Sequence, residues 1–164
     1  MNFHIKDLNY SIPPMKYFDI IKNNDWSIFL NSNYEKYSDQ RYDILTSNPI
    51  EKIILENADR GSDINKDNIF TKIQNIIKKN QCSSHEGIPF CGGAIGFMSY
   101  DYGNELHNIE TKNIECFNYP LVAFGIYDWC ITYDHLKKKS FILYHKKNQI
   151  VNKIINYKFT DKEL

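Results

Sequence analysis

A long run of β-branched and aromatic residues, from Leu121 to Tyr133, is the feature of this 164-residue sequence that most restricts its fold. A run of this composition favours an extended strand. The polar stretch Asp134 to Lys138 follows it, and Lys139 to His145 is again strand-like. Two such segments joined by a short polar stretch predict an antiparallel hairpin, so the fold must contain an antiparallel sheet.

The rest of the sequence alternates between strand and helix patterns. Further strands are expected at residues 26–30, 41–47 and 50–56, and the glycine-dense segment 91–100 is also strand-like. The first of these is mostly apolar, which predicts that both of its faces are covered. Helices are expected just after Pro13-Pro14, from Asn68 to Lys79 and from Gln149 to Tyr157. We predict an α+β fold with mainly antiparallel β-sheets and a few flanking helices, in one domain spanning residues 1–164.

Composition excludes several classes of function. Lys and Arg together number 20, as do Asp and Glu, so the formal net charge is zero. This balance disfavours a nucleic-acid-binding protein and a polybasic membrane-surface protein. No stretch approaches the roughly 18 apolar residues of a membrane-spanning helix, and the N-terminus has no apolar run of signal-peptide length. The four cysteines have no Cys-x-x-Cys spacing, so we expect a cytoplasmic protein with reduced thiols and no metal site.

Two short motifs have a chemical and a structural interpretation. Gly92-Gly93 with Gly96 could cradle a phosphate, but no Lys-Ser/Thr follows and the next residues look like a strand. We therefore favour a strand whose glycines allow close backbone approach. Asp134-His135 could form an acid/base dyad, but adjacent residues in a turn point in different directions, so we favour a solvated turn. Neither motif supplies a catalytic set.

Three separated segments, in order, resemble a known family. Residues 88–103 read I-P-F-C-G-G-A-I-G-F-M-S-Y-D-Y-G, which is similar to the P-F-x-G-G-x-x-G-x-x-x-Y-D-x-G segment of the component I subunits of anthranilate synthase and aminodeoxychorismate synthase. Residues 125–129 with Asp134-His135 resemble the G-x-Y-D-W…D-H stretch of the second enzyme. Residues 26–32, 41–44 and Asn48-Pro49 resemble its first strands. The segments Arg41 to Ile44 and Gly125 to Trp129 look more like aminodeoxychorismate synthase than anthranilate synthase.

The resemblance implies a non-catalytic part of a larger enzyme. In this family the N-terminal region is one lobe of a two-lobed β-sandwich, and residues 1–164 are similar to that region. The chorismate site, its magnesium and its acid/base groups lie in a C-terminal region that this chain lacks, so we expect no catalytic residue and no cofactor here. The implied activity makes 4-amino-4-deoxychorismate from chorismate and glutamine-derived ammonia, on the route to 4-aminobenzoate and folate. The implied partners are the C-terminal chorismate-binding region and a glutamine amidotransferase subunit.

The resemblance also implies part of an L-tryptophan pocket, regulatory in anthranilate synthase and structural in aminodeoxychorismate synthase. The pocket positions in this sequence are Ser32, Asp39, Gln40, Arg41 and Tyr42. An indole needs an apolar wall, and the amino and carboxylate groups need hydrogen-bond partners, because burying them unpaired is costly. Asn31 departs from the Glu that many anthranilate synthases carry, and an amide cannot form the same charge-assisted bond to an ammonium. An ordinary strand end and loop is the alternative for these residues.

Two other functions stay open on the sequence alone. One is the N-terminal regulatory domain of an anthranilate synthase component I, in tryptophan biosynthesis. The other is a degenerate, stand-alone amino-acid-binding module. Whether an in-frame chorismate-binding segment lies next to this one in the gene would separate these possibilities.

Overall fold

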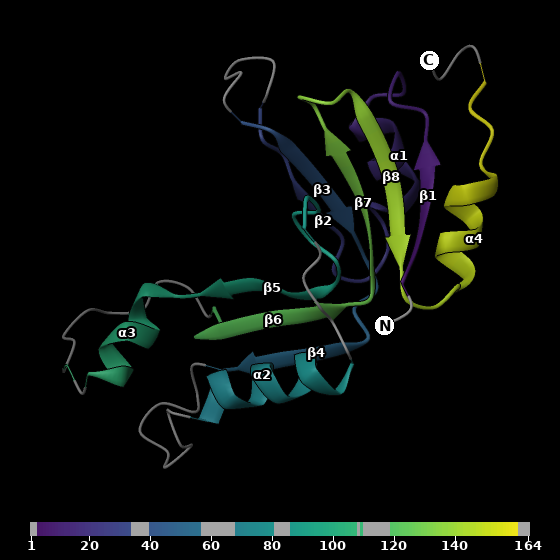
Figure 1. Ribbon diagram of the computed structural model, residues 1–164. Coiled ribbons are helices and arrows are strands. Elements are labelled where there is room, and N and C mark those ends of the chain that lie inside the picture. Colours follow the sequence, from purple (N-terminus) through teal and green to yellow (C-terminus); the bar gives the residue numbers. More distant parts are fainter. Residues whose placement is uncertain are drawn as a thin grey trace.

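The computed structural model describes residues 3–33, 40–56, 68–80, 86–107, 109 and 119–160. Within these ranges the chain forms two antiparallel sheets and four helices, so the α+β prediction is confirmed (Figure 1). The chain passes directly between the two sheets twice, through residues 47–50 and through Asp128, and helices cover one face of each sheet. This arrangement buries two main groups of apolar side chains, one on each sheet.

The larger sheet has five strands in the order β1-β8-β7-β3-β2. Their bounds are His4–Leu8 (β1), Lys139–Tyr144 (β8), Trp129–Asp134 (β7), Tyr42–Thr46 (β3) and Ile28–Leu30 (β2). The predicted hairpin is β7 with β8, with Trp129 opposite Tyr144 and Asp134 opposite Lys139. Strand β2 is shorter than predicted and lies at the edge, where Leu30 is 46% exposed. The expectation that both of its faces are covered is therefore wrong, because Phe29 packs against Phe18 on one face while Leu30, which points to the opposite face, is exposed.

The smaller sheet has three strands in the order β4-β6-β5. Their bounds are Glu51–Leu55 (β4), Val122–Tyr127 (β6) and Gly93–Met98 (β5). The single strand predicted from Leu121 to Tyr133 is in fact two strands, β6 and β7, which belong to different sheets and meet at Asp128. Asp128 is the one charged residue in this otherwise apolar run, and a single polar residue with no proline beside it is not sufficient to divide the run into two strands.

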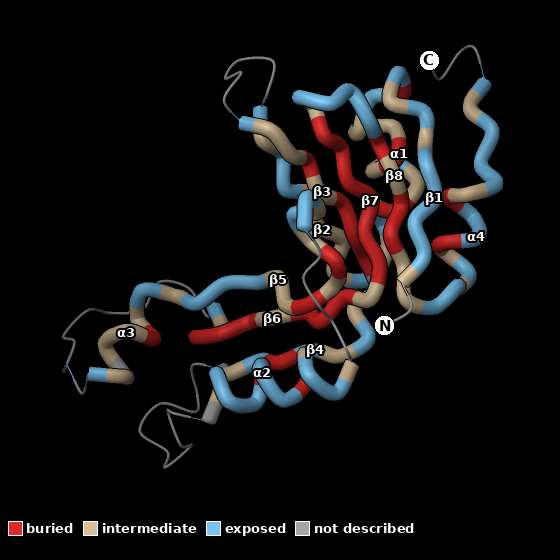
Figure 2. The backbone as a smooth tube through the Cα atoms, in the orientation of Figure 1, coloured by how far each residue is buried: buried red, intermediate tan, exposed pale blue. Residues whose placement is uncertain are grey.

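Two helices cover one face of the larger sheet (Figures 1 and 2). Helix α1 spans Pro14–Ile21 and helix α4 spans Gln149–Asn156, and Asn148 caps α4 by accepting a hydrogen bond from the Val151 N–H at 2.9 Å. The buried side chains between these helices and the sheet are Ile12, Tyr17, Ile21, Leu45, Trp129, Ile131, Tyr133, Ile142, Val151 and Ile154. Trp129 is fully buried, and its indole N–H donates to the Ser47 carbonyl at 2.9 Å.

Helix α2 covers one face of the smaller sheet, and its bounds, Asn68–Lys79, are those predicted from the sequence. Ile73 and Ile76 of this helix pack against Ile53 and Ile126 of the sheet. Two elements were not predicted: strand β1 at the sheet edge, and helix α3, which spans Tyr100–Leu106. Strand β1 is mostly exposed, so it lacks the apolar alternation that identifies a half-buried strand.

The glycine motif lies in and beside β5, which confirms its structural interpretation. Gly92 and Gly93 have φ values of 96° and 139°, in a region that residues with a Cβ rarely adopt. A Cβ on Gly96 would lie 2.0 Å from the Ala123 carbonyl oxygen on neighbouring β6. The glycine is therefore required for strand pairing at this point.

Candidate functional site

The residues of the predicted tryptophan pocket come from the end of the larger sheet where β2 ends and β3 begins. Ser32 lies two residues after β2, Arg41 directly precedes β3, and Tyr42 is the first residue of β3. Gln40 is exposed, and Asp39 lies outside the described residues. β7 ends at the same end of the sheet, because its last residue, Asp134, is paired with Tyr42.

Ser32 is held by Asp43, a carboxylate that is only 1% exposed. The Ser32 N–H donates to Asp43 Oδ1 at 2.7 Å, and the Ser32 hydroxyl donates to the same oxygen at 2.8 Å. The Asn31 amide donates to Asp43 Oδ2 at 3.3 Å, while its own oxygen accepts from the Asn33 N–H at 2.8 Å. The turn after β2 is therefore organised around a single buried carboxylate.

His135 meets the other side of Asp43. Its Nε2 lies 3.1 Å from Asp43 Oδ2, and its Nδ1 lies 3.0 Å from the Tyr10 hydroxyl. The ring stacks on Tyr133 with centroids 6.0 Å apart. Burial raises the pKa of Tyr133, whose hydroxyl donates to the Ile12 carbonyl, so this phenol stays neutral. The buried carboxylate thus faces a group that can carry a proton or a positive charge, which reduces the cost of burying it.

Arg41 and Asp134 form a two-point ion pair. The guanidinium donates from Nε at 2.9 Å and from Nη2 at 2.6 Å to the two carboxylate oxygens. These hydrogen bonds from Arg41 are the main reason why the pKa of Asp134 is lowered, and the Lys137 N–H adds another. The Arg41 guanidinium also lies over the Tyr42 ring, 4.6 Å from its centroid. A fork-to-fork pair fixes the arginine more firmly than a single contact would.

The solvated-turn interpretation of Asp134-His135 is wrong. The Asp134 side chain is 5% exposed and the His135 side chain 12% exposed. The two side chains do point in different directions, as expected, but each has a partner at β3. Asp134 contacts Arg41, and His135 contacts Asp43. The adjacent Asp and His are therefore not a dyad; the histidine pairs with Asp43 instead.

The candidate residues divide between the two faces of the sheet. Opposite residues in an antiparallel pair share a face, so Tyr42 lies with Asp134, and Asp43 lies with Tyr133 on the face that α1 and α4 cover. Arg41 and Tyr42 are therefore brought together, whereas Ser32 is bound from the other side through Asp43. The described residues therefore fix the Ser32 hydroxyl toward one face of the sheet, and the Arg41 guanidinium with the Tyr42 ring toward the other face.

Sequence reasoning missed Asp43, His135 and Tyr10 as part of this network. A usable signal existed for the first, since Asp43 is a charged residue in the middle of the apolar strand pattern Tyr-Asp-Ile-Leu. A carboxylate at such a position is rarely buried without a partner. No local pattern pairs it with Tyr10, because 33 positions separate the two, nor with His135 on a distant strand.

The described residues offer no metal centre. Within them, no group of three or more His, Cys, Asp or Glu side chains could hold a metal ion. None of the helices in the described ranges is long and apolar enough to cross a membrane.

Comparison with known proteins supports the family resemblance. The family described as chorismate binding enzyme matches residues 29–159. Aminodeoxychorismate synthase component 1 of Escherichia coli (strain K12) is 27% identical over 139 residues, which is 79% of this chain and 30% of that protein. The protein of the same name from Klebsiella aerogenes is 26% identical over 131 residues, 75% of this chain and 29% of that protein. Anthranilate synthase alpha subunit 1, chloroplastic, of Oryza sativa subsp. japonica is 34% identical over 68 residues, 36% of this chain and 11% of that protein.

These matches assign the chain to a family. The chain belongs to the family of chorismate binding enzymes. It is related to the component I proteins of aminodeoxychorismate synthase and anthranilate synthase. It spans about 30% of the length of the aminodeoxychorismate synthase relatives.

Proposed function

We propose that this chain is a non-catalytic, structural or regulatory part of an aminodeoxychorismate synthase component I. The complete enzyme would make 4-amino-4-deoxychorismate from chorismate and glutamine-derived ammonia, on the route to 4-aminobenzoate and folate. The relatives named aminodeoxychorismate synthase component 1 support this assignment over most of the chain. The proposal places magnesium and the chorismate chemistry in a chorismate-binding region outside residues 1–164.

The organisation of Ser32 around Asp43 is the observation that carries the regulatory part of the proposal. Because the Ser32 hydroxyl donates to Asp43, its oxygen lone pairs remain available to accept from a ligand ammonium. Arg41 uses Nε and Nη2 on Asp134, which leaves Nη1 for a ligand carboxylate. The Tyr42 ring offers an apolar surface beside it. Each group suits one part of an amino acid such as L-tryptophan, and because Ser32 and the pair of Arg41 and Tyr42 lie toward different faces of the sheet, a complete pocket would need groups outside this set.

The departure at Asn31 fits this division of roles. Its amide nitrogen is engaged by Asp43 and its amide oxygen by the Asn33 N–H. The side chain is therefore used to shape the turn and is not directed at a ligand. Recognition of an ammonium must then rest on Ser32 and on groups outside this set.

We expect the isolated chain to bind L-tryptophan weakly, in the millimolar range or worse. The reason is that part of the contacts is missing, and each 1.4 kcal/mol lost weakens binding about tenfold. Isothermal titration calorimetry measures this affinity directly. The matched control is Ser32→Ala, which should weaken the residual binding further. Micromolar affinity of the wild-type chain would show that the pocket is complete within these residues, and no binding at any concentration would remove the tryptophan proposal.

We also expect the isolated chain to form no aminodeoxychorismate or anthranilate from chorismate when ammonia and magnesium are supplied. Lewis-acid and proton-transfer catalysis need groups that the proposal places elsewhere. Product formation is followed by chromatography over several hours, with a complete component I protein as the positive control. Turnover that survives repurification of the chain would contradict the non-catalytic assignment.

The smaller sheet supports the proposal of a partner. On its face opposite α2, Ile54 is 45% exposed and Phe97 46% exposed, and Ala123 of β6 lies between them in the register. Tyr100 at the start of α3 is 90% exposed. An uncovered apolar sheet face is typical of an interface. A chorismate-binding region is the partner that we assign to it, and a glutamine amidotransferase subunit would complete the enzyme.

A second candidate is the N-terminal regulatory domain of an anthranilate synthase component I. The chloroplastic rice relative, 34% identical over 68 residues, favours it locally. A stand-alone amino-acid-binding module would share the Ser32 site but not the need for a partner. The gene neighbourhood distinguishes these cases, since an adjacent in-frame chorismate-binding segment favours either enzyme and excludes the module.

A further inference from the structure

His135, directly after β7, contacts two segments that are distant from it in the sequence. Its Nε2 lies 3.1 Å from Asp43 Oδ2 on β3, and its Nδ1 lies 3.0 Å from the hydroxyl of Tyr10, which follows β1. The His135 backbone N–H also donates to the Arg41 carbonyl at 3.0 Å. With its backbone anchored and its side chain only 12% exposed, the imidazole is held between a carboxylate and a phenol.

The carboxylate of Asp43 links this imidazole to Ser32. The Ser32 N–H and hydroxyl both donate to Oδ1, at 2.7 and 2.8 Å, while the other oxygen, Oδ2, faces His135. The two oxygens belong to one planar group, so a change of charge beside Oδ2 also acts on the oxygen that holds Ser32. Because the Asp43 side chain is buried, salt and water screen this effect much less than they would on the surface.

The partners of the imidazole define where its protons lie. A carboxylate only accepts, so the nitrogen that faces Asp43 carries a hydrogen. In the neutral ring, Nδ1 then accepts from the Tyr10 hydroxyl, whereas in the charged ring Nδ1 donates and Tyr10 accepts. Protonation therefore turns the Tyr10 hydroxyl and places a positive charge opposite Asp43. Charge-assisted contacts of this kind are shorter and stronger than neutral ones.

Near neutral pH, the imidazole is the group in this network that changes its charge. Imidazole side chains ordinarily gain a proton between about pH 5 and 8, whereas tyrosines ordinarily ionise near pH 10. Burial raises the pKa of Tyr133, on which the His135 ring stacks. Burial also raises the pKa of Tyr17 on α1, which packs edge-on against Tyr133. Both phenols therefore stay neutral in this range.

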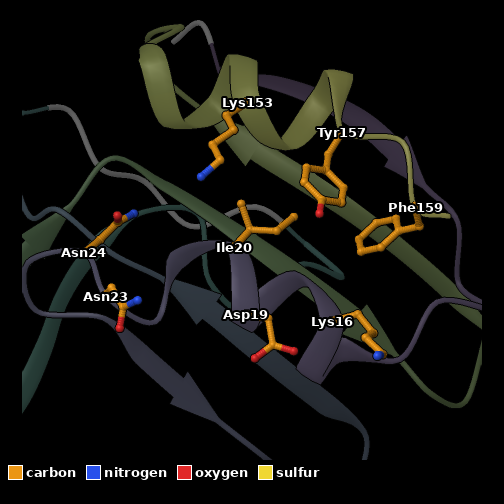
Figure 3. A pocket seen from close by; sticks show the side chains of 8 residues that line it. All are labelled: Lys16, Asp19, Ile20, Asn23, Asn24, Lys153, Tyr157 and Phe159. Atoms are coloured by element: carbon orange, nitrogen blue, oxygen red, sulfur yellow. The ribbon is translucent and has the colours of Figure 1, made fainter. Parts of the chain in front are cut away.

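The other charged groups of the neighbouring elements are engaged or lie elsewhere. Arg41 and Asp134 form their own ion pair, and residues 137–139 are exposed lysines in the turn. The cleft between α1 and α4 in Figure 3 is not lined by any residue of this network, and its charged lining is Lys16, Asp19 and Lys153. In the described part of the chain, a change of charge opposite Asp43 near neutral pH therefore comes from His135.

We propose that His135 is a positioning residue for Ser32 that acts through Asp43, and that protonation of its imidazole tightens the hold of the carboxylate on the turn after β2. In the charged state Asp43 is bound from both sides, so the Ser32 hydroxyl is fixed and an amino-acid ligand binds more tightly at lower pH. This consequence for a ligand rests on the proposed function, because it requires Ser32 to contact the ligand. The coupling between His135 and Ser32 does not rest on it.

A pH titration of the ¹⁵N-labelled chain without ligand tests the coupling. The Ser32 amide and the ring C–H signals of His135 are followed from about pH 5 to 8, the range in which imidazoles ordinarily titrate. We expect both signals to shift with one midpoint, because the imidazole charge acts on the carboxylate that accepts from the Ser32 N–H. A Ser32 amide that stays constant while His135 titrates would overturn the proposal, and so would a His135 ring that does not titrate in this range.

His135→Gln is the matched variant, because a glutamine amide still has a donor for Asp43 but does not titrate. We expect its Ser32 amide to show no step. His4→Gln is the control, since His4 is an exposed histidine of β1 that stacks on Tyr144, and it should leave the step unchanged. A step that persists in His135→Gln would contradict the proposal. If that variant does not fold, the comparison of midpoints in the wild-type chain decides the question.

Titration with L-tryptophan at two pH values connects the coupling to the proposed function. The ligand is zwitterionic at both about pH 6 and about pH 7.5, so a change in its affinity arises in the protein. We expect binding to be about two- to five-fold tighter at the lower pH, because a hydrogen bond to a charged group is stronger than a neutral one. His135→Gln should show equal affinities. Equal affinities in the wild-type chain would overturn the role of His135 in ligand binding.

The two titrations separate failure of this inference from failure of the proposed function. A shared midpoint of Ser32 and His135 without any tryptophan binding would support the coupling and remove the proposed pocket. Tryptophan binding with no pH-dependent step at Ser32 would keep the pocket and overturn the role of His135.

Discussion

Replacing Trp129 by alanine is expected to lower the free energy of unfolding by about 3–5 kcal/mol, which is the usual cost of deleting a fully buried large aromatic side chain. Trp129 is 0% exposed and lies under α1 and α4, so its loss leaves a cavity in the main core. It also leaves the Ser47 carbonyl without the indole donor at 2.9 Å. A loss of this size is a large part of the stability of an ordinary domain, about 5–15 kcal/mol.

Urea denaturation followed by far-UV circular dichroism measures the effect of Trp129→Ala. Trp26→Ala is the matched control, because the same side chain is removed from a half-buried position where Lys52 lies 5.1 Å from the ring centroid. We expect the control to cost about 1 kcal/mol or less. If Trp129→Ala does not fold, Trp129→Phe keeps most of the ring volume and isolates the loss of the hydrogen bond. Equal losses for the two alanine variants would contradict the assignment of Trp129 to the core.

The elements that could be predicted are those whose side-chain spacing is decided locally. Helix α2 has its predicted bounds because its isoleucines recur at helical spacing and one stripe is buried at Ile73 and Ile76. The β7–β8 hairpin follows from two apolar runs around a polar turn. The glycines of β5 were also interpreted correctly, since close strand approach needs no side chain at Gly96.

The elements that escaped prediction depend on distant contacts. The break at Asp128 occurs because β6 and β7 pair with different partners, β4 and β5 on one side and β3 and β8 on the other. Strand β1 forms because the edge of β8 offers unpaired backbone groups, although its own side chains are mostly exposed. Strand β1 leaves no local apolar pattern in the sequence, and the break leaves only the single charged residue Asp128.

The candidate site also has a part that the sequence indicates and a part that depends on distant contacts. The resemblance indicated Ser32, Arg41 and Tyr42 by position, and the structure adds what holds them: Asp43 for the first and Asp134 for the second. The role of Ser32, Arg41 and Tyr42 in binding tryptophan stays a prediction, as does that of Asp39 and Gln40. Ion pairs between β3 and β7 are set by strand register, and register is a property of the folded sheet.

Replacing Asp43 by alanine is expected to destabilise the chain by about 3 kcal/mol, because this buried carboxylate accepts hydrogen bonds from Ser32 and Asn31, and one hydrogen bond to a charged group contributes about 1.5–3 kcal/mol. The Ser32 N–H and hydroxyl lose the oxygen that they share, and His135 Nε2 loses the carboxylate 3.1 Å away. These groups lie where water reaches poorly, so the lost bonds are not fully replaced. Thermal unfolding and urea titration both measure the change, and Asp7→Ala on exposed β1 is the control, with an expected effect of about 0.5 kcal/mol or less.

A double-mutant cycle identifies which contact carries the cost. Asp43→Ala and His135→Ala are measured singly and together, and a coupling energy of about 0.5–3 kcal/mol is expected for side chains in direct contact. Asp43→Asn keeps the size of the side chain and one acceptor oxygen for Ser32, so it should cost less than Asp43→Ala. Its remaining cost reports the loss of the negative charge together with the loss of the Oδ2 acceptor, which receives the Asn31 amide and faces His135 Nε2. Asp43→Ala with a stability close to that of Asp7→Ala would show that this carboxylate does not organise the turn after β2, and Ser32 would then lack the fixed hydroxyl on which amino-acid recognition at this sheet end depends.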